Sequence, residues 1–285
     1  MESKRLWEYI RRLIPIFIFG VLLSGSVLAF NSPTHRYVTE TSLECIFKIN
    51  ETVRCLDDES EKYLKDKNYS EVIAKNSITP DIDEAEGIYK CHFYNPMTEK
   101  NFMREKISAC TKCVEHFNKA VDYYKESKKN KEDKENIKNI EKAFEELGRA
   151  AHFMEDLNTP VHTGYDLPSD AVLKFPLHVR FEKTCDLVMK ECKNDFLPKE
   201  KESIKETLRY FYVNDIESLA KVSSLLSSDN FYYLINEKEP NEKSIAKDAI
   251  RNAQYNVTGM LCKFFAQVGE QETEKGGLEN DIKQS

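Results

Sequence analysis

The fold is decided near the middle of the chain, where residues 137–162 read IKNIEKAFEELGRAAHFMEDLNTPVH. The part from Ile137 to Leu157 has helical periodicity, and the whole chain is rich in the helix formers Lys, Glu, Leu and Ala. Asn158 and Pro160 end this helix, because proline has no amide hydrogen to donate and fixes its own φ angle. The sequence therefore predicts a long helix that is followed by a proline-containing loop.

Helical spacing recurs on both sides of this stretch. Nine Gly and nine Pro leave few residues for turns, which disfavours a fold of many short strands. We see no internal repeat, no Gly-rich phosphate loop and no alternation of strands with helices. The prediction is an all-α fold, built as a single multi-helix domain. Helices are also expected over 34–49, 58–74, 102–125, 169–193, 199–227 and 244–268, with irregular backbone at 75–101 and a solvated charge run at 125–136.

The composition limits the class of protein. With 285 residues, of which 40% are hydrophobic and 32% are charged, the chain has enough apolar side chains for a core. Its net charge of −7 gives no basic surface for tight duplex binding, so no duplex DNA partner is expected. The negative charge does not exclude hydrolysis of a polyanion, because bound metal ions invert the local electrostatics.

The N-terminus has the layout of a secretory signal. A basic start within residues 1–12 precedes the apolar run Leu13–Leu23, and small residues surround a cut site after Ala29. An uncleaved anchor is the alternative, but the run is shorter than the roughly 18 residues that a membrane span needs. We therefore expect a signal peptide over 1–29, a secreted domain over 30–268 and a polar tail over 269–285.

All eight cysteines follow residue 29, and an even number in an exported chain favours disulfides. Free thiols and a thiolate metal site are the alternatives. Cys110 and Cys113 have the spacing of half a zinc site, but no second pair with this spacing exists. Cys185 and Cys192 are not expected to pair with each other, because seven residues of helix rise by about 10 Å.

Imidazole and carboxylate side chains recur at spacings that suit a metal ion. His152 and Asp156 lie four positions apart on the predicted helix and share one face, and the loop after the helix presents His162. His178 and Glu182 have the same spacing on a later predicted helix. Taken singly, such pairs are also explained by ion pairs on a helix surface.

Two further groups lie nearer the N-terminus. His92 and an acid, Asp81 or Asp83, fall in irregular backbone, where a solvated loop is the simpler interpretation. After cleavage, the amine and carbonyl of Phe30 would lie close to His35 in sequence and could chelate a metal together. A disordered terminus is the alternative there.

These groups gain weight when they are taken together. Five of the six histidines lie beside an acid or beside the processed terminus, which suggests several zinc ions rather than one. The exception is His116, which has no acid four positions away and is interpreted as a surface or partly buried helix residue.

The stretch HFMEDLNTPVH resembles the signature of the superfamily of zinc-dependent phospholipases C and single-strand-specific nucleases. FNSPTH at the predicted terminus, PDID and HFYNP in the loop, and the later HVRFE resemble further parts of that family in the same order. The resemblance covers most of the mature chain and implies an all-α domain with three zinc ions at the base of a cleft. One departure is Phe30, where the family usually has Trp. Backbone ligand atoms do not depend on this change, whereas any stacking role of the ring does.

The resemblance also implies which residues hold the ions. Asp156 would bridge two closely spaced ions, and Asp81 and Asp156 are the candidate catalytic residues. Asp81 directly follows Pro80, is favoured over Asp83 for that reason, and is the candidate general base. One ion would take Asp81, His92, His152 and Asp156, its neighbour would take the amine and carbonyl of Phe30 with His35 and Asp156, and the third would take His162, His178 and Glu182.

The activity implied is that of a zinc-dependent phosphodiester hydrolase, because zinc lowers the pKa of water to about 7 and a zinc pair clamps phosphate oxygens. Glu182 and the short segment between His162 and His178 resemble phospholipases C that act on phospholipid headgroups. The short spacing from Phe30 to His35 resembles the single-strand nucleases instead. A non-catalytic, zinc-stabilised binding protein is the third alternative.

The expected partners follow from this activity. The substrate would be a phospholipid or another phosphodiester, and the protein is expected to act as a monomer. Any contact with membranes would be peripheral, through aromatic residues near the cleft such as Phe93 and Tyr94.

Overall fold

The computed structural model describes residues 32–53, 56–66, 68–84, 89–129, 134–196, 215–236 and 241–277. Every regular element in these ranges is helical, which confirms the predicted all-α class. One isolated bridge pairs Asn95 with Lys100. The predicted signal peptide, Phe30 and Cys55 lie outside the described residues.

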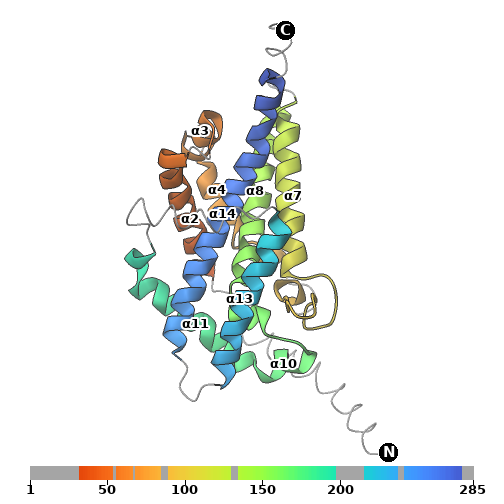
Figure 1. Cartoon of the computed structure of the whole chain (residues 1–285), viewed down its shortest axis with the longest axis vertical. Coiled ribbons are helices and arrows are strands. Elements are labelled where there is room, and N and C mark those ends of the chain that lie inside the picture. The colour runs from red at the N-terminus through yellow and green to blue at the C-terminus, as the bar shows by residue number, and fades with distance from the viewer. Residues whose placement is uncertain are drawn as a thin grey trace, which may run out of the picture.

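Six long helices form the body of the described part of the chain, and shorter ones connect them (Figure 1). The long helices are α2 (Ser32–Val53), α7 (Ala109–Ser127), α8 (Lys134–Leu157), α11 (Phe175–Glu191), α13 (Ile216–Asn236) and α14 (Glu242–Gly277). The short ones are α3 (Asp58–Asp66), α4 (Tyr69–Asn76), α5 (Pro80–Asp83), α9 (Pro160–Thr163) and α10 (Pro168–Leu173), with 3-10 turns η1 (Lys90–His92) and η2 (Lys193–Asp195).

Helix α8 is the centre of the bundle. It packs against α7, α4 and α14, and Figure 1 shows α7, α8 and α14 running together along the long axis. From Leu147 to Leu157 every residue except Arg149 is buried, so this half of the helix is enclosed on all sides. The buried half of α8 carries the predicted His and Asp ligands.

Helices α4 and α8 cross at close range because Gly148 has no side chain. A Cβ atom at this position would lie 2.4 Å from the carbonyl oxygen of Ile73 and 2.8 Å from the Cβ of Asn76. The crossing brings the end of α4 to His152, whose Nδ1 donates to the carbonyl oxygen of Ser77 at 2.8 Å. Packing at Gly148 therefore helps to orient a predicted metal ligand.

Several helix limits in the N-terminal half differ from the predicted ones, and two of these differences have a local cause. The region 58–74 is divided into α3 and α4 at Asn68, which has a left-handed φ of 58° that asparagine tolerates. The helix expected over 102–125 is α7, which begins only after Ser108, because this serine caps it through a capping box.

The C-terminal half also departs from expectation. Helix α14 continues beyond the expected limit at residue 268 as far as Gly277. Residues 199–214 of the helix expected over 199–227 lie outside the described residues, and α13 begins at Ile216. No helix in the described part of the chain is both long and apolar enough to span a bilayer.

Candidate metal centre

Three groups of buried His, Asp and Glu side chains lie around the C-terminal end of α8. Within each group, one ligand-type atom from every residue lies within 4.8 Å of the others. Eight of the predicted ligands come together in this way, and the ninth, Phe30, lies outside the described residues. The groups are His35, His152 and Asp156 (the first group), Asp81, His92 and His152 (the second group), and His162, His178 and Glu182 (the third group).

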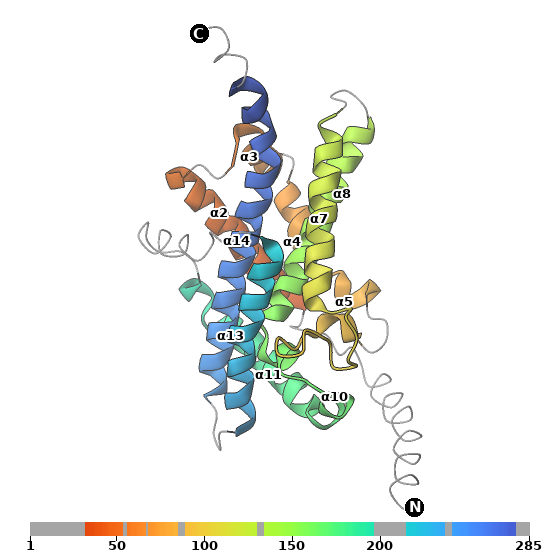
Figure 2. The same cartoon turned by 45° about the vertical axis from the view of Figure 1, so that its right-hand side comes forward.

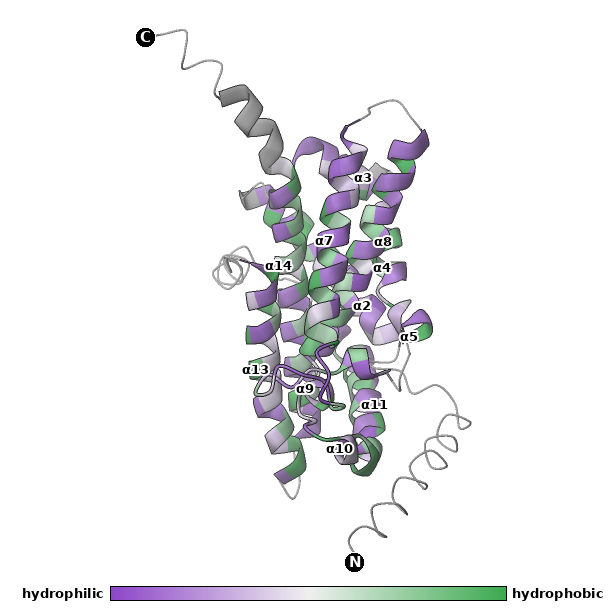
Figure 3. Ribbon diagram, turned by 90° about the vertical axis from the view of Figure 1, so that its right-hand side faces the viewer, coloured by the Kyte–Doolittle hydropathy of each residue, from purple (hydrophilic) through white to green (hydrophobic). Residues whose placement is uncertain are grey.

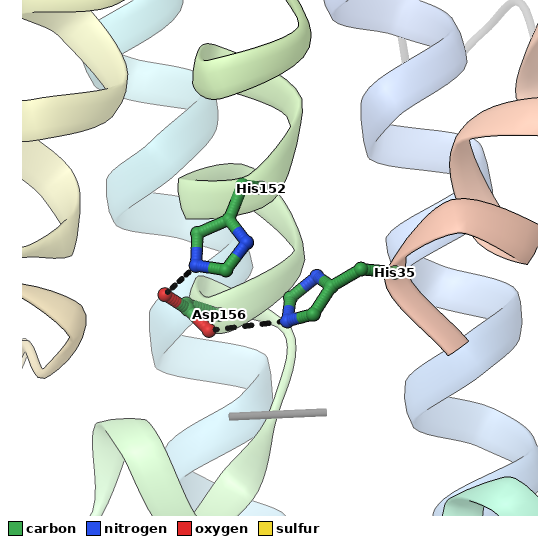
Figure 4. Close-up of side chains that lie close together, drawn as sticks. All are labelled: His35, His152 and Asp156. Carbon is green, nitrogen blue, oxygen red and sulfur yellow. Dashed lines mark ion pairs between the residues drawn. The ribbon is translucent and has the colours of Figure 1, made fainter. Parts of the chain in front are cut away.

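The first group joins α8 to α2. His152 and Asp156 project from successive turns of α8, and His35 approaches them from α2 (Figure 4). Oδ2 of Asp156 lies 3.3 Å from Nε2 of His152, and its Oδ1 lies 3.9 Å from Nε2 of His35. Oδ2 also lies 2.9 Å from Nδ1 of His92. The two carboxylate oxygens thus face different imidazoles, as a bridging ligand requires.

The second group adds α5 and the turn η1. Oδ1 of Asp81 lies 3.6 Å from Nε2 of His152 and 3.8 Å from Nδ1 of His92. The alternative acid, Asp83, is half exposed and receives a hydrogen bond from Arg149 at 3.0 Å. The geometry therefore brings Asp81, and not Asp83, to the histidines.

The third group is formed by the turn after α8 and by α11. Pro160 begins the short helix α9, which turns His162 back toward the bundle. Nε2 of His162 lies 3.6 Å from Oε1 of Glu182, and Nε2 of His178 lies 2.6 Å from the same oxygen. His162 from the loop and His178 from the helix thus meet at the carboxylate of Glu182, as the sequence spacing suggested.

In three of the histidines, an acceptor in the protein holds the ring nitrogen Nδ1. Backbone carbonyl oxygens accept from Nδ1 of His152 at 2.8 Å and of His162 at 2.9 Å, and the carboxylate of Glu155 accepts from Nδ1 of His35. Because a neutral imidazole carries one hydrogen, Nε2 of each ring keeps a lone pair that faces its group. Metal-ligating histidines have this arrangement.

The donor set fits zinc. Nε2 of His162 and Oδ1 of Asp156 are buried and make no hydrogen bond to the described residues, a situation that costs free energy unless a cation satisfies them. Imidazole nitrogens and carboxylate oxygens in sets of three or four are typical zinc ligands. The three groups therefore offer suitable zinc sites.

Burial and neighbouring charges shift the pKa values of the group members. Burial lowers the pKa of His178 to about 4, so its imidazole is neutral near pH 7 and free to bind a metal. Burial raises the pKa of Glu182 to about 7, which a nearby cation would oppose. Burial also acts to lower the pKa of His152, but the carboxylates of Asp156 and Asp81 outweigh it and raise this pKa to about 9, a rise that a bound cation would oppose.

His116 lies apart from the three groups, and its interpretation as a surface or partly buried helix residue is wrong. It is buried, with Nδ1 2.6 Å from Glu146 and Nε2 2.9 Å from Glu84. Lys112 and Arg149 also pair with Glu84, at 2.7 and 2.8 Å. Burial acts to lower the pKa of His116, but its hydrogen bonds to the two acids raise it overall. This network fastens the segment after α5 to α7 and α8.

Two expectations about other side chains need correction. Phe93 and Tyr94 do not face a membrane, since they are 7% and 3% exposed and Phe93 stacks on the ring of His162. No disulfide joins two cysteines of the described ranges, so the disulfide prediction has no support there. Cys110 and Cys113 are instead buried on the core side of α7, where a thiol packs like a small apolar side chain.

Solved structures with a similar fold include two clostridial toxins. The chain is similar to the alpha toxin of Clostridium absonum, with a TM-score of 0.57 and 20% identity over 81% of this chain and 62% of that one. It is also similar to the alpha-toxin of Clostridium perfringens from avian strain SWCP, with a TM-score of 0.59 and 20% identity over 83% of this chain and 64% of that one. The chain thus spans less than two thirds of the length of either toxin, and the likeness shows the fold.

A search of curated proteins finds no match to this sequence. A family profile, in contrast, does match it. A family profile described as zinc dependent phospholipase C matches residues 47–240, which is more than half of the chain and includes seven of the eight ligand-type residues in the three groups. The chain therefore belongs to the zinc dependent phospholipase C family.

Proposed function

We propose that this protein is an exported zinc-dependent phosphodiester hydrolase, a phospholipase C that acts on phospholipid headgroups. One observation carries the proposal: buried histidines and acids from five helices and a turn converge into three adjoining groups. Membership of the zinc dependent phospholipase C family supports zinc as the metal and a phospholipid as the substrate.

The side chains of the three groups would hold three zinc ions. Bound zinc supplies water with a pKa near about 7 and attracts phosphate oxygens. One ion would be held by Asp81, His92, His152 and Asp156, the next by Phe30, His35 and Asp156, and the third by His162, His178 and Glu182.

Asp81 is the general base in this proposal. Its carboxylate is buried beside two histidines and would take a proton, at one Oδ atom, from the attacking water. The water oxygen bonds to phosphorus, the bond from phosphorus to the glycerol oxygen breaks, and the departing glycerol oxygen takes a proton from solvent, to which Asp81 returns the proton that it accepted. The phosphorylated headgroup is the second product.

The third group favours an enzyme over a zinc-stabilised binding protein. Among the described residues it offers three protein ligands, His162, His178 and Glu182. Structural zinc sites usually fill all four positions with protein ligands, whereas catalytic sites keep one for water or substrate. The ligand count therefore matches a site that keeps one coordination position for water or substrate.

Export would complete the first group. Cleavage after Ala29 would make Phe30 the first residue, shortly before α2 begins at Ser32. Its amine and carbonyl would then lie close in sequence to His35, and together they would serve the ion bridged by Asp156.

We assign membrane contact to an apolar rim, which consists of Ile82, Met97 and Leu173. These side chains are 73%, 81% and 77% exposed. Ile82 follows Asp81 directly, Met97 lies in the loop after His92, and Leu173 ends α10. Figure 2 shows α5, this loop and α10 toward the end of the molecule away from the α7–α8 connection, and Figure 3 shows hydrophobic residues on α5 and α10. Each side chain of the rim therefore lies on a segment that carries a predicted ligand or directly precedes one.

Replacing Met97 and Leu173 with Ser should weaken binding to phosphatidylcholine vesicles by about tenfold per residue. Burying such a side chain contributes about 1.5 kcal/mol or more, and about 1.4 kcal/mol corresponds to tenfold in affinity. Vesicle co-sedimentation measures the loss, while hydrolysis of a soluble short-chain phosphatidylcholine should stay unchanged. The matched control is Ile137→Ser, which removes a 63% exposed side chain near the other end of α8. If all variants bind the vesicles as strongly as the wild type, the assignment of membrane contact to the rim is wrong.

The proposed activity is tested by incubating the purified protein with phosphatidylcholine vesicles and, separately, with single-stranded DNA. We expect diacylglycerol release that a chelator abolishes and that added zinc restores. Cleavage of DNA without diacylglycerol release would make the protein a nuclease of the same superfamily. If a protein with three bound zinc ions shows neither activity, the result would favour the zinc-stabilised binding protein.

A further inference from the structure

Glu155 is a fully buried acid that no ligand set includes. It lies on α8 between His152 and Asp156 and has 0% exposure. Acidic side chains are almost never fully buried unless they are paired. Within the described parts of the chain, no Lys or Arg side chain forms an ion pair with it. Its burial therefore needs another explanation.

Both oxygens of Glu155 contact α2. Oε2 accepts a hydrogen bond from Nδ1 of His35, and Oε1 accepts one from Oγ1 of Thr39 at 2.7 Å. His35 and Thr39 lie four positions apart, so one face of α2 meets the carboxylate at two points. Glu155 thus fixes the rotation of α2 as well as the plane of one imidazole.

The contact with Nδ1 decides which nitrogen of His35 is the metal donor. A carboxylate accepts hydrogen bonds, so the ring hydrogen stays on Nδ1 and the lone pair stays on Nε2. Nε2 is the atom that lies 3.9 Å from Oδ1 of Asp156. The ring of His35 also stacks on that of His152, with centroids 4.1 Å apart, so its position is defined on a second side.

We propose that Glu155 is a positioning residue that orients His35 for zinc. This inference rests on the proposed function. Removal of an outer-shell partner of this kind typically weakens metal binding about 10- to 100-fold.

The test measures zinc affinity by competition with a chelator in the purified mature chain. Glu155→Gln keeps the volume but offers one acceptor oxygen to the two donors, His35 and Thr39, so it should weaken the binding of one of the three zinc ions by about 10- to 100-fold. Glu155→Met removes the acceptor too and should weaken it further. The matched control is Glu141→Gln, the same change at an exposed position of α8, which should leave all three affinities unchanged.

Double variants identify the ion concerned. In a His35→Ala background, Glu155→Gln should have no further effect, because the ring that it orients is gone. In a His178→Ala background, its effect should be undiminished, because the third group does not contact Glu155. If Glu155→Gln fails to fold, Thr39→Val removes the other hydrogen bond of the carboxylate and should also weaken that ion.

Two outcomes would overturn the inference. One is an unchanged zinc affinity in Glu155→Gln, and the other is an equal loss in the His35→Ala and His178→Ala backgrounds. A wild-type chain that binds three zinc ions but hydrolyses no phosphodiester would refute the proposed function and leave the role of Glu155 standing. Phosphodiester hydrolysis by the wild type, together with unchanged zinc binding in Glu155→Gln, would support the proposed function and refute the role of Glu155.

Discussion

Asp156→Asn should remove two of three zinc ions and reduce kcat/KM on phosphatidylcholine by more than about 100-fold, since the loss of an outer-shell partner alone costs about 10- to 100-fold. The two oxygens of Asp156 face His35 on one side and His92 and His152 on the other. An amide replaces one of these oxygens with an NH2 group, which cannot bind a cation. Zinc content per chain and steady-state kinetics measure the two losses.

The matched control for this change is Asp83→Asn. Asp83 lies next to the site, is half exposed, and pairs with Arg149. Its replacement should leave zinc content at three ions and activity near that of the wild type. An Asp156→Asn protein that keeps all three ions would contradict the bridging role.

Gly148→Ala should destabilise the protein by about 1–3 kcal/mol or more, the range that overpacking of a core typically costs. The new Cβ would lie 2.4 Å from the carbonyl oxygen of Ile73, which is a backbone atom, so α4 and α8 would have to separate. Because Ser77 at the end of α4 holds Nδ1 of His152, we also expect weaker zinc binding by the groups that share this histidine. Thermal unfolding and chelator competition measure the two effects.

A second glycine provides the control. At Gly269 on α14, the one described atom that a Cβ atom would meet is Oδ2 of Asp57, at an ordinary distance of 3.7 Å. Gly269→Ala should therefore raise the free energy of unfolding by about 0.5–1 kcal/mol, the usual gain from removing a glycine within a helix. A Gly148→Ala protein as stable as Gly269→Ala would show that the crossing of α4 and α8 can relax.

Much of the fold and part of the site could be predicted from local signals. Periodicity and Pro160 define α8 and its end, and the predicted all-α class is confirmed. The spacing of four in His152 and Asp156, and in His178 and Glu182, puts each pair on one face of a helix regardless of the rest of the chain. Spacing alone does not say which distant segments meet these faces.

The remaining features depend on tertiary packing. Asp81 and Asp83 are two positions apart, and Arg149 separates them by pairing with Asp83 at the surface while Asp81 stays inside. Glu155 is an acid on a helix, a type of residue that is usually exposed. Only the approach of α2, with His35 at its first turns, explains why it is buried.

The groups differ in how far apart their members lie along the chain, and this affects the order of assembly. The third group uses only α9 and α11, which follow each other closely and contact each other. The contact between His35 and Glu155 instead spans 120 positions. Closing a longer loop costs more entropy, so distant contacts form later during folding. A refolding chain should therefore acquire its metal ions stepwise, with the third group competent first and the ion next to α2 arriving last.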